Sequence, residues 1–170
     1  FCFMGLLVYM KVPALLTKGL DDRAEAIREE LDEARRLREE AQQLLADYQK
    51  KAREAESEAK AMIDQARIEA ESVKAIQTRF QDAEKFKSAA ESVEDYRIRA
   101  LAIKEARADL VKDHLWVLWT DYFKPEHVEK YPQLHELFWN ANKEAGLAKK
   151  AVDPAQGQKL LDSIDEIGKI

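Results

Sequence analysis

Residues 20–73 read LDDRAEAIREELDEARRLREEAQQLLADYQKKAREAESEAKAMIDQARIEAESV. They contain neither glycine nor proline, and neither residue occurs anywhere between positions 20 and 124. Glycine and proline are the strongest helix breakers, whereas Ala, Glu, Arg, Lys, Gln and Leu favour the helix. The sequence therefore predicts one long helix over residues 20–124, unbroken or with minor interruptions. Unbroken, such a helix would be about 155 Å long, which predicts an extended rod rather than a compact domain.

A narrow stripe of small and apolar residues follows this predicted helix. Its members recur about every 3.5 residues, which places them on one side of a helix. Charged residues fill most of the positions between them. A stripe this narrow is typical of a seam with another helix rather than of a face buried in a globule. The full stripe runs from Ala24 to Val73 and also includes Leu37, Tyr48 and Met62. Within it, the predicted pairing seam consists of Ala24, Ile27, Leu31, Ala34, Ala41, Leu45, Ala52, Ala55, Ala59, Ala66 and Ala70.

The N-terminal segment FCFMGLLVYM is uncharged and is followed by Lys11. A helix needs roughly 20 apolar residues to cross a bilayer, so this segment is interpreted as the last part of a membrane-spanning helix. Pro13 would then bend the chain where it leaves the membrane. A buried apolar terminus of a soluble protein is the alternative. The predicted membrane anchor consists of Phe1, Phe3, Leu6, Leu7, Val8 and Tyr9.

The N-terminal apolar segment is followed by Lys11-Val-Pro13 and Leu20, and then by an Ala/Glu/Arg-rich helix in which Arg23, Ile27, Leu31 and Ala34 keep helical spacing. This order of features resembles subunit b of the F-type ATP synthase, in its alphaproteobacterial forms. The resemblance covers roughly residues 4–73. It implies a peripheral-stalk subunit that pairs with a second copy or a homologue and holds the catalytic head still against the rotor.

Towards the C-terminus the sequence departs from that family and becomes aromatic, most clearly in HLWVLWTDYF at residues 114–123. Pro125 ends the predicted long helix. Two short helices are expected after it, one following Pro132 and one with Asp153 as N-cap and Pro154 at its first position. Two roles are open for the aromatic residues. They either pack the C-terminal segments onto the end of the long helix or form a docking surface for another subunit. The predicted docking surface consists of Trp116, Trp119, Phe123, Phe138 and Trp139.

The composition favours few kinds of chemistry. The net charge of -5 argues against a nucleic-acid-binding face, which would have to be basic. The only cysteine is Cys2, and the three histidines, His114, His127 and His135, do not form a zinc motif. No glycine-rich phosphate loop or nucleophile elbow occurs. The sequence therefore predicts no catalytic residues, cofactor or metal, and a chain that is not an enzyme.

These observations predict an all-α protein with one very long extended helix, a membrane-inserted N-terminal segment and a small helical C-terminal region. The predicted parts are residues 1–19, 20–124 and 125–170. The resemblance implies a single-pass stator subunit in a bacterial or mitochondrial inner membrane. Its expected partners are a second b-type helix, the catalytic head with its delta/OSCP-type subunit, the membrane-sector a and c subunits, and the lipid bilayer. The alternatives are a membrane-tethered coiled-coil adaptor unrelated to ATP synthesis and a soluble helical binding module.

Overall fold

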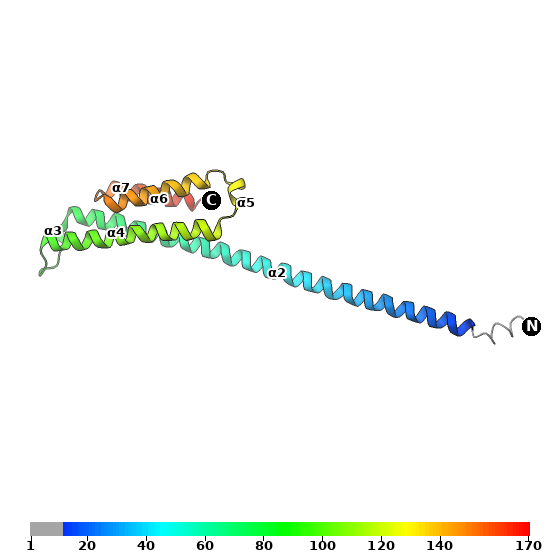
Figure 1. The fold of residues 1–170 in the computed structure, drawn as a ribbon. Coiled ribbons are helices and arrows are strands. Elements are labelled where there is room, and N and C mark those ends of the chain that lie inside the picture. Colours follow the sequence, from blue (N-terminus) through cyan, green and yellow to red (C-terminus); the bar gives the residue numbers. More distant parts are fainter. Residues whose placement is uncertain (1–11) are drawn as a thin grey trace, which may run out of the picture. The chain divides into compact units, whose positions relative to one another are not determined.

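The computed structural model describes residues 12–170, with side chains from residue 21 onward. Every regular element in these residues is helical (Figure 1). The chain divides into two compact units, residues 1–52 and 53–170. The elements are α2 (Val12–Gln81), α3 (Ala83–Phe86), α4 (Val93–Val117), the π-helix η1 (Leu118–Tyr122), α5 (Pro125–Lys130), α6 (Leu134–Lys150) and α7 (Pro154–Ile167).

The described part of the first unit is a single helix, the N-terminal portion of α2. All its side chains from residue 21 to residue 52 are exposed, including apolar ones such as Leu31 (63%) and Leu45 (59%). Arg36 and Glu40, one helical turn apart, form an ion pair with 3.6 Å between Nε and Oε1. An exposed pair of this kind adds only about 0.3–0.5 kcal/mol. Within this unit, no other described element covers the apolar side chains.

The second unit is an antiparallel arrangement of four helices: the last part of α2, then α4, α6 and α7 (Figure 1). The α4 helix runs back along the end of α2, and α6 and α7 lie beside them. The connection from α6 to α7 is short, as is typical of antiparallel neighbours, whereas α3 lies between α2 and α4, and η1 and α5 lie between α4 and α6. Polar contacts tie the four together, for example Arg107 of α4 to Glu69 of α2 and Arg67 of α2 to Asp165 of α7.

The core of this bundle combines small side chains on α2 with large ones on the other helices. Ala66, Ala70 and Val73 of α2 are at most 1% exposed, so the neighbouring helices can approach closely. Full burial of a Leu, Ile or Phe side chain contributes about 1.5–3 kcal/mol. The large core residues include Leu115, Leu118, Leu134, Phe138, Leu160 and Ile164.

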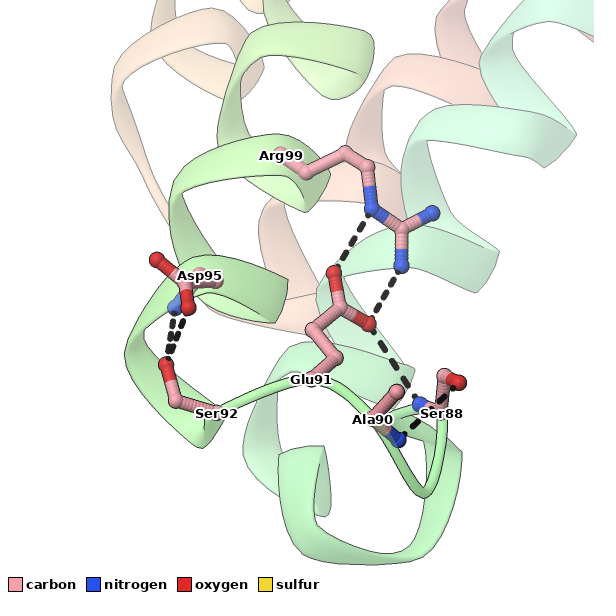
Figure 2. Close-up of polar contacts among 6 residues, drawn as sticks. All are labelled: Ser88, Ala90, Glu91, Ser92, Asp95 and Arg99. Carbon is pink, nitrogen blue, oxygen red and sulfur yellow. Dashed lines mark hydrogen bonds and ion pairs between the residues drawn. The ribbon is translucent and has the colours of Figure 1, made fainter.

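The chain reverses between α3 and α4 without glycine or proline (Figure 2). Ser92 is the N-cap of α4: its Oγ accepts the backbone N–H of Asp95 at 3.0 Å and donates to the Asp95 carboxylate at 2.6 Å. Glu91 accepts two hydrogen bonds from Arg99, at 2.9 and 2.7 Å. The hydrogen bond from Arg99 holds the pKa of the Glu91 carboxyl below its ordinary value. Local polar contacts therefore fix the point at which α4 starts.

The two C-terminal helices follow the sequence prediction. Asp153 caps α7 by accepting the backbone N–H of Ala155 at 2.9 Å, and Pro154 occupies the first helical position. The predicted apolar face of α7, which includes Leu160 and Ile164, is buried in the core.

The predicted single helix over residues 20–124 is wrong. The α2 helix ends at Gln81, and α4 returns to pack on it. The aromatic segment at residues 114–123 spans the end of α4 and the π-helix η1 rather than the tip of a rod. The predicted membrane-inserted fold is also not supported, because no helix within residues 12–170 is both long and apolar enough to cross a bilayer. The predicted anchor itself lies outside the described residues.

We predict that Ser92→Ala destabilises the second unit by about 1 kcal/mol, because α4 loses its N-cap. The measurement is chemical denaturation of the full chain followed by circular dichroism. Ser57→Ala is the matched control, since Ser57 is exposed in the α2 helix and alanine is a better helix former. Equal stability of the Ser92 variant and the wild type would contradict the described start of α4.

Candidate functional site

Two buried polar side chains hold the C-terminal end of α6. Lys104 of α4 is 1% exposed, and its Nζ donates to the carbonyl oxygens of Lys149 (2.6 Å) and Ala151 (2.7 Å). Gln77 of α2 is fully buried, and its Nε2 donates to the carbonyls of Ala148 (3.3 Å) and Ala151 (3.2 Å). Burial lowers the pKa of Lys104. Both groups satisfy carbonyls left unpaired at a helix end, which is a structural role.

An ion pair between a half-exposed arginine and a buried glutamate joins α2 to α4. Glu69 is 3% exposed, and both of its carboxylate oxygens accept hydrogen bonds from Nη1 of Arg107, at 2.9 and 2.8 Å. The Nε2 atom of Gln65 donates to the same carboxylate at 3.1 Å. Removing one partner of such a pair would leave a buried charge without compensation, so the pair fixes the register of α4 on α2.

A cavity of about 470 Å³ lies between α2 and α4 and carries three guanidinium groups. Arg107 is paired with Glu69 and Arg99 with Glu91, whereas the Arg79 guanidinium lies over the Phe86 ring, 5.6 Å from its centre. The hydrogen bond to Glu91 raises the pKa of Arg99. The cavity lining is therefore cationic, and its remaining members are Ser72, Ala75, Ile76, Tyr96, Ala100 and Ile103.

The aromatic residues near the end of α4 form a cluster with α6. Trp119 packs against Phe123 and Phe138, with ring centres 6.2 and 5.1 Å apart. The His135 ring meets Trp119 edge-on at 5.7 Å, and His127 stacks on Tyr122 at 5.5 Å. Much of the aromatic segment is thus used in packing the C-terminal segments onto α4.

The five predicted docking residues do not share one environment. Phe138 is buried and Trp119 and Phe123 are partly buried, whereas Trp116 (67%) and Trp139 (58%) are exposed. Both exposed tryptophans border a hollow of about 260 Å³. No described contact tests whether another protein docks there, and this stays a prediction.

The predicted seam residues are also divided. Those from Ala24 to Ala55 are exposed along α2, whereas Ala59, Ala66 and Ala70 lie in the core of the chain's own bundle. The last three therefore face α4, α6 and α7. The predicted membrane anchor, Phe1 to Tyr9, lies outside the described residues.

Comparison with known proteins identifies the bundle. The sequence model of the family "Nickel-containing superoxide dismutase" matches residues 60–170. Over residues 60–170, this chain belongs to the nickel-containing superoxide dismutase family. The nickel superoxide dismutase of Streptomyces seoulensis is 56% identical over 106 residues, which are 62% of this chain and 75% of that protein. The enzyme of Streptomyces coelicolor is 52% identical over 106 residues.

Solved structures agree with this family assignment. Native nickel superoxide dismutase matches 63% of this chain and 85% of its own, with a TM-score of 0.55 and 50% sequence identity. The apo structure of a nickel superoxide dismutase matches 63% of this chain and 89% of its own, with a TM-score of 0.54. The family match over residues 60–170 lies within the second unit, residues 53–170.

The N-terminal part matches a second family. The model "ATP synthase B/B' CF(0)" matches residues 1–110, so that part belongs to the ATP synthase B/B' family and overlaps the superoxide dismutase match. ATP synthase subunit b 2 of Maricaulis maris is 60% identical over 72 residues. The chain spans only 39% of that relative's length. The resemblance seen in the sequence is therefore correct for part of the chain.

These matches correct the functional predictions. The predicted non-catalytic stator subunit is wrong, because residues 60–170 belong to a family of superoxide dismutases, which are enzymes. The prediction that the chain is not an enzyme is wrong for the same reason. The predicted single-pass position in an inner membrane is not supported by these relatives, which are superoxide dismutases over residues 60–170.

The described residues do not fit the nickel that the family name implies. Nickel in proteins is bound by thiolate and nitrogen donors such as imidazole. Residues 12–170 contain no cysteine. No group of three or more His, Cys, Asp or Glu side chains converges among the described residues in a way that could hold a metal ion. We therefore assign none of them as a nickel ligand.

No local motif in the sequence indicates the superoxide dismutase family. The charged residues that mark the bundle, such as Glu69, Arg99 and Arg107, look like a solvated helix surface in the sequence. Nothing in their spacing indicates a pair that bridges two helices. The family is recognised only when residues 60–170 are compared with known sequences.

We predict that Gly157→Ala destabilises the bundle by about 1–3 kcal/mol, because the site is overpacked. A Cβ at Gly157 would meet Oε1 of Gln77 and lie 2.8 Å from Cα of Lys74, which is backbone. Thermal denaturation measures the effect.

The matched control is Gly146→Ala, also within a helix. There the Cβ would meet only the flexible end of Lys112, at 3.3 Å. We expect that variant to be neutral or stabilised by up to about 1 kcal/mol. Equal effects of the two substitutions would contradict the close packing of α7 on α2.

Proposed function

We propose that this chain is a superoxide dismutase, an oxidoreductase that disproportionates superoxide. The main support is its 56% identity, over 106 residues, to a nickel superoxide dismutase of which it covers 75%. The shared fold, at 50% identity to the native enzyme structure, adds to that support. The proposal rests on this relationship, because the described residues contain no recognisable metal centre.

The reaction converts two superoxide ions and two protons into O₂ and H₂O₂. One superoxide loses an electron and becomes O₂, and the other gains that electron and takes up both protons. The family name gives nickel as the metal of these enzymes. Since residues 12–170 do not fit nickel, we assign no electron-transfer step to any of them.

The contribution we assign to the described residues is electrostatic and structural. Superoxide is an anion, and the cavity between α2 and α4 is lined by Arg79, Arg99 and Arg107. A concave surface of one sign of charge raises the local concentration of oppositely charged substrates. Two of the three arginines are partly neutralised by Glu69 and Glu91, so Arg79 supplies most of the attraction.

We also propose that the exposed stripe of α2 between Ala24 and Ala55 pairs with another helix. Large apolar side chains on it, such as Leu31 (63% exposed) and Tyr48 (64% exposed), favour coverage by a partner. The other partners expected from the sequence, namely the head, the a and c subunits and lipid, stay predictions that no described contact tests.

The test of the proposed function is a direct assay on the full chain. The protein is produced with nickel in the medium, purified, and mixed with superoxide in a stopped-flow instrument. We expect superoxide to disappear faster than its spontaneous disproportionation, with a rate proportional to protein concentration and to the nickel content measured on the same sample.

The control is the same preparation after treatment with a nickel chelator, in which the catalysed rate should fall to the spontaneous one. Decay no faster than the spontaneous reaction in a folded, nickel-supplied sample would overturn the proposed function. Circular dichroism establishes that both samples are folded.

A further inference from the structure

We infer that residues 12–170 do not themselves hold nickel, so that the donors for any nickel bound by this chain lie outside them. The family assigned to residues 60–170 is named for the metal. The inference follows from the donor atoms that these residues offer, considered one class at a time.

Sulfur donors are almost absent from the described residues. The single cysteine of the chain is Cys2, which lies outside them. Of the three methionines, only Met62 is described, and it packs against the hydrophobic core of the bundle. Thiolates are the sulfur ligands that bind transition metals most strongly, and residues 12–170 offer none.

Imidazole donors are present but do not converge. The Nδ1 atom of His127 accepts the backbone N–H of Lys124 at 3.0 Å, so this nitrogen is already used, and the ring stacks on Tyr122. His135 lies on α6 against the edge of Trp119. His114, in the last turn of α4, is the third. The three do not form a metal-holding group with each other or with nearby carboxylates within residues 12–170.

Two carboxylates of the bundle that lie at helix contacts are matched to cations instead. Glu69 is bound by Arg107, and Asp109 accepts hydrogen bonds from Lys149 at 2.9 and 2.6 Å. The bond to Asp109 raises the pKa of Lys149, which therefore stays protonated. A divalent cation at either carboxylate would have to displace an ammonium or guanidinium group, which disfavours its binding there.

The bundle therefore belongs to the family although its own residues offer no nickel site. The bundle keeps the fold of its relatives and is 50–56% identical to them over the aligned residues. Within residues 12–170, no set of His, Cys, Asp or Glu side chains converges to hold a metal ion. Superoxide dismutation by this chain, if the proposed function holds, depends on metal donors that this bundle does not supply.

The test is nickel binding to the full chain, measured without reference to activity. Metal-free protein is dialysed against nickel chloride at a concentration close to that of the protein, and the bound metal is measured by atomic spectrometry. The variants are His114→Gln, His127→Gln and His135→Gln, singly and combined, because these side chains are the only imidazoles in the sequence. The single variants keep the test valid if the triple variant does not fold.

We expect every folded histidine variant to bind the same number of nickel ions per chain as the wild type. Loss of tightly bound nickel in any of them would overturn the inference and leave the proposed function standing. If no form binds nickel, the inference stands and the proposed function fails, since a nickel-dependent rate would then be impossible. Nickel binding that is equal in all forms supports both.

Discussion

The reversal of the chain between α3 and α4 is the constraint on which the second unit depends. If α2 continued straight past Gln81, the residues of α4 would extend it instead of folding back along it. The buried alanines of α2 would then be exposed, and α6 and α7 could not pack against α2 and α4 together. Because the chain turns at Ser92 and Glu91, α4 returns along α2 and the Glu69–Arg107 pair can form across the two helices. The cavity lined by Arg79 and the family fold both follow from that turn.

Helix content and the C-terminal helices could be predicted from the sequence, whereas the reversal could not. The alanine spacing and the Asp153-Pro154 start signal are local, and the structure has both as predicted. The reversal is made by serine and charged residues that also favour helices or their exposed faces. Ser92 followed three residues later by Asp95 resembles a capping signal, but such pairs also occur inside exposed helices. The absence of glycine and proline was therefore a poor guide to continuity.

The functional class of the chain, like the reversal, could not be predicted from local sequence patterns. The N-terminal resemblance to ATP synthase subunit b is correct for part of the chain, yet the family of residues 60–170 decides the class of the protein. Within this part, the buried Glu69 pairs with Arg107, 38 positions further along the chain, and no periodicity indicates that contact. The three histidines form no metal motif in the sequence, and in the structure His127 and His135 pack within the aromatic cluster.

The most direct test of this account is the distance between α2 and α4 in solution. Spin labels at Ile68 and Ala106, both exposed, are introduced into a Cys2→Ser background and measured by pulsed electron resonance. Adjacent packed helices lie about 8–10 Å apart between axes, so with the label arms we expect a separation below about 30 Å. A continuous helix would place the two positions about 57 Å apart, and a distance near that value would contradict the bundle.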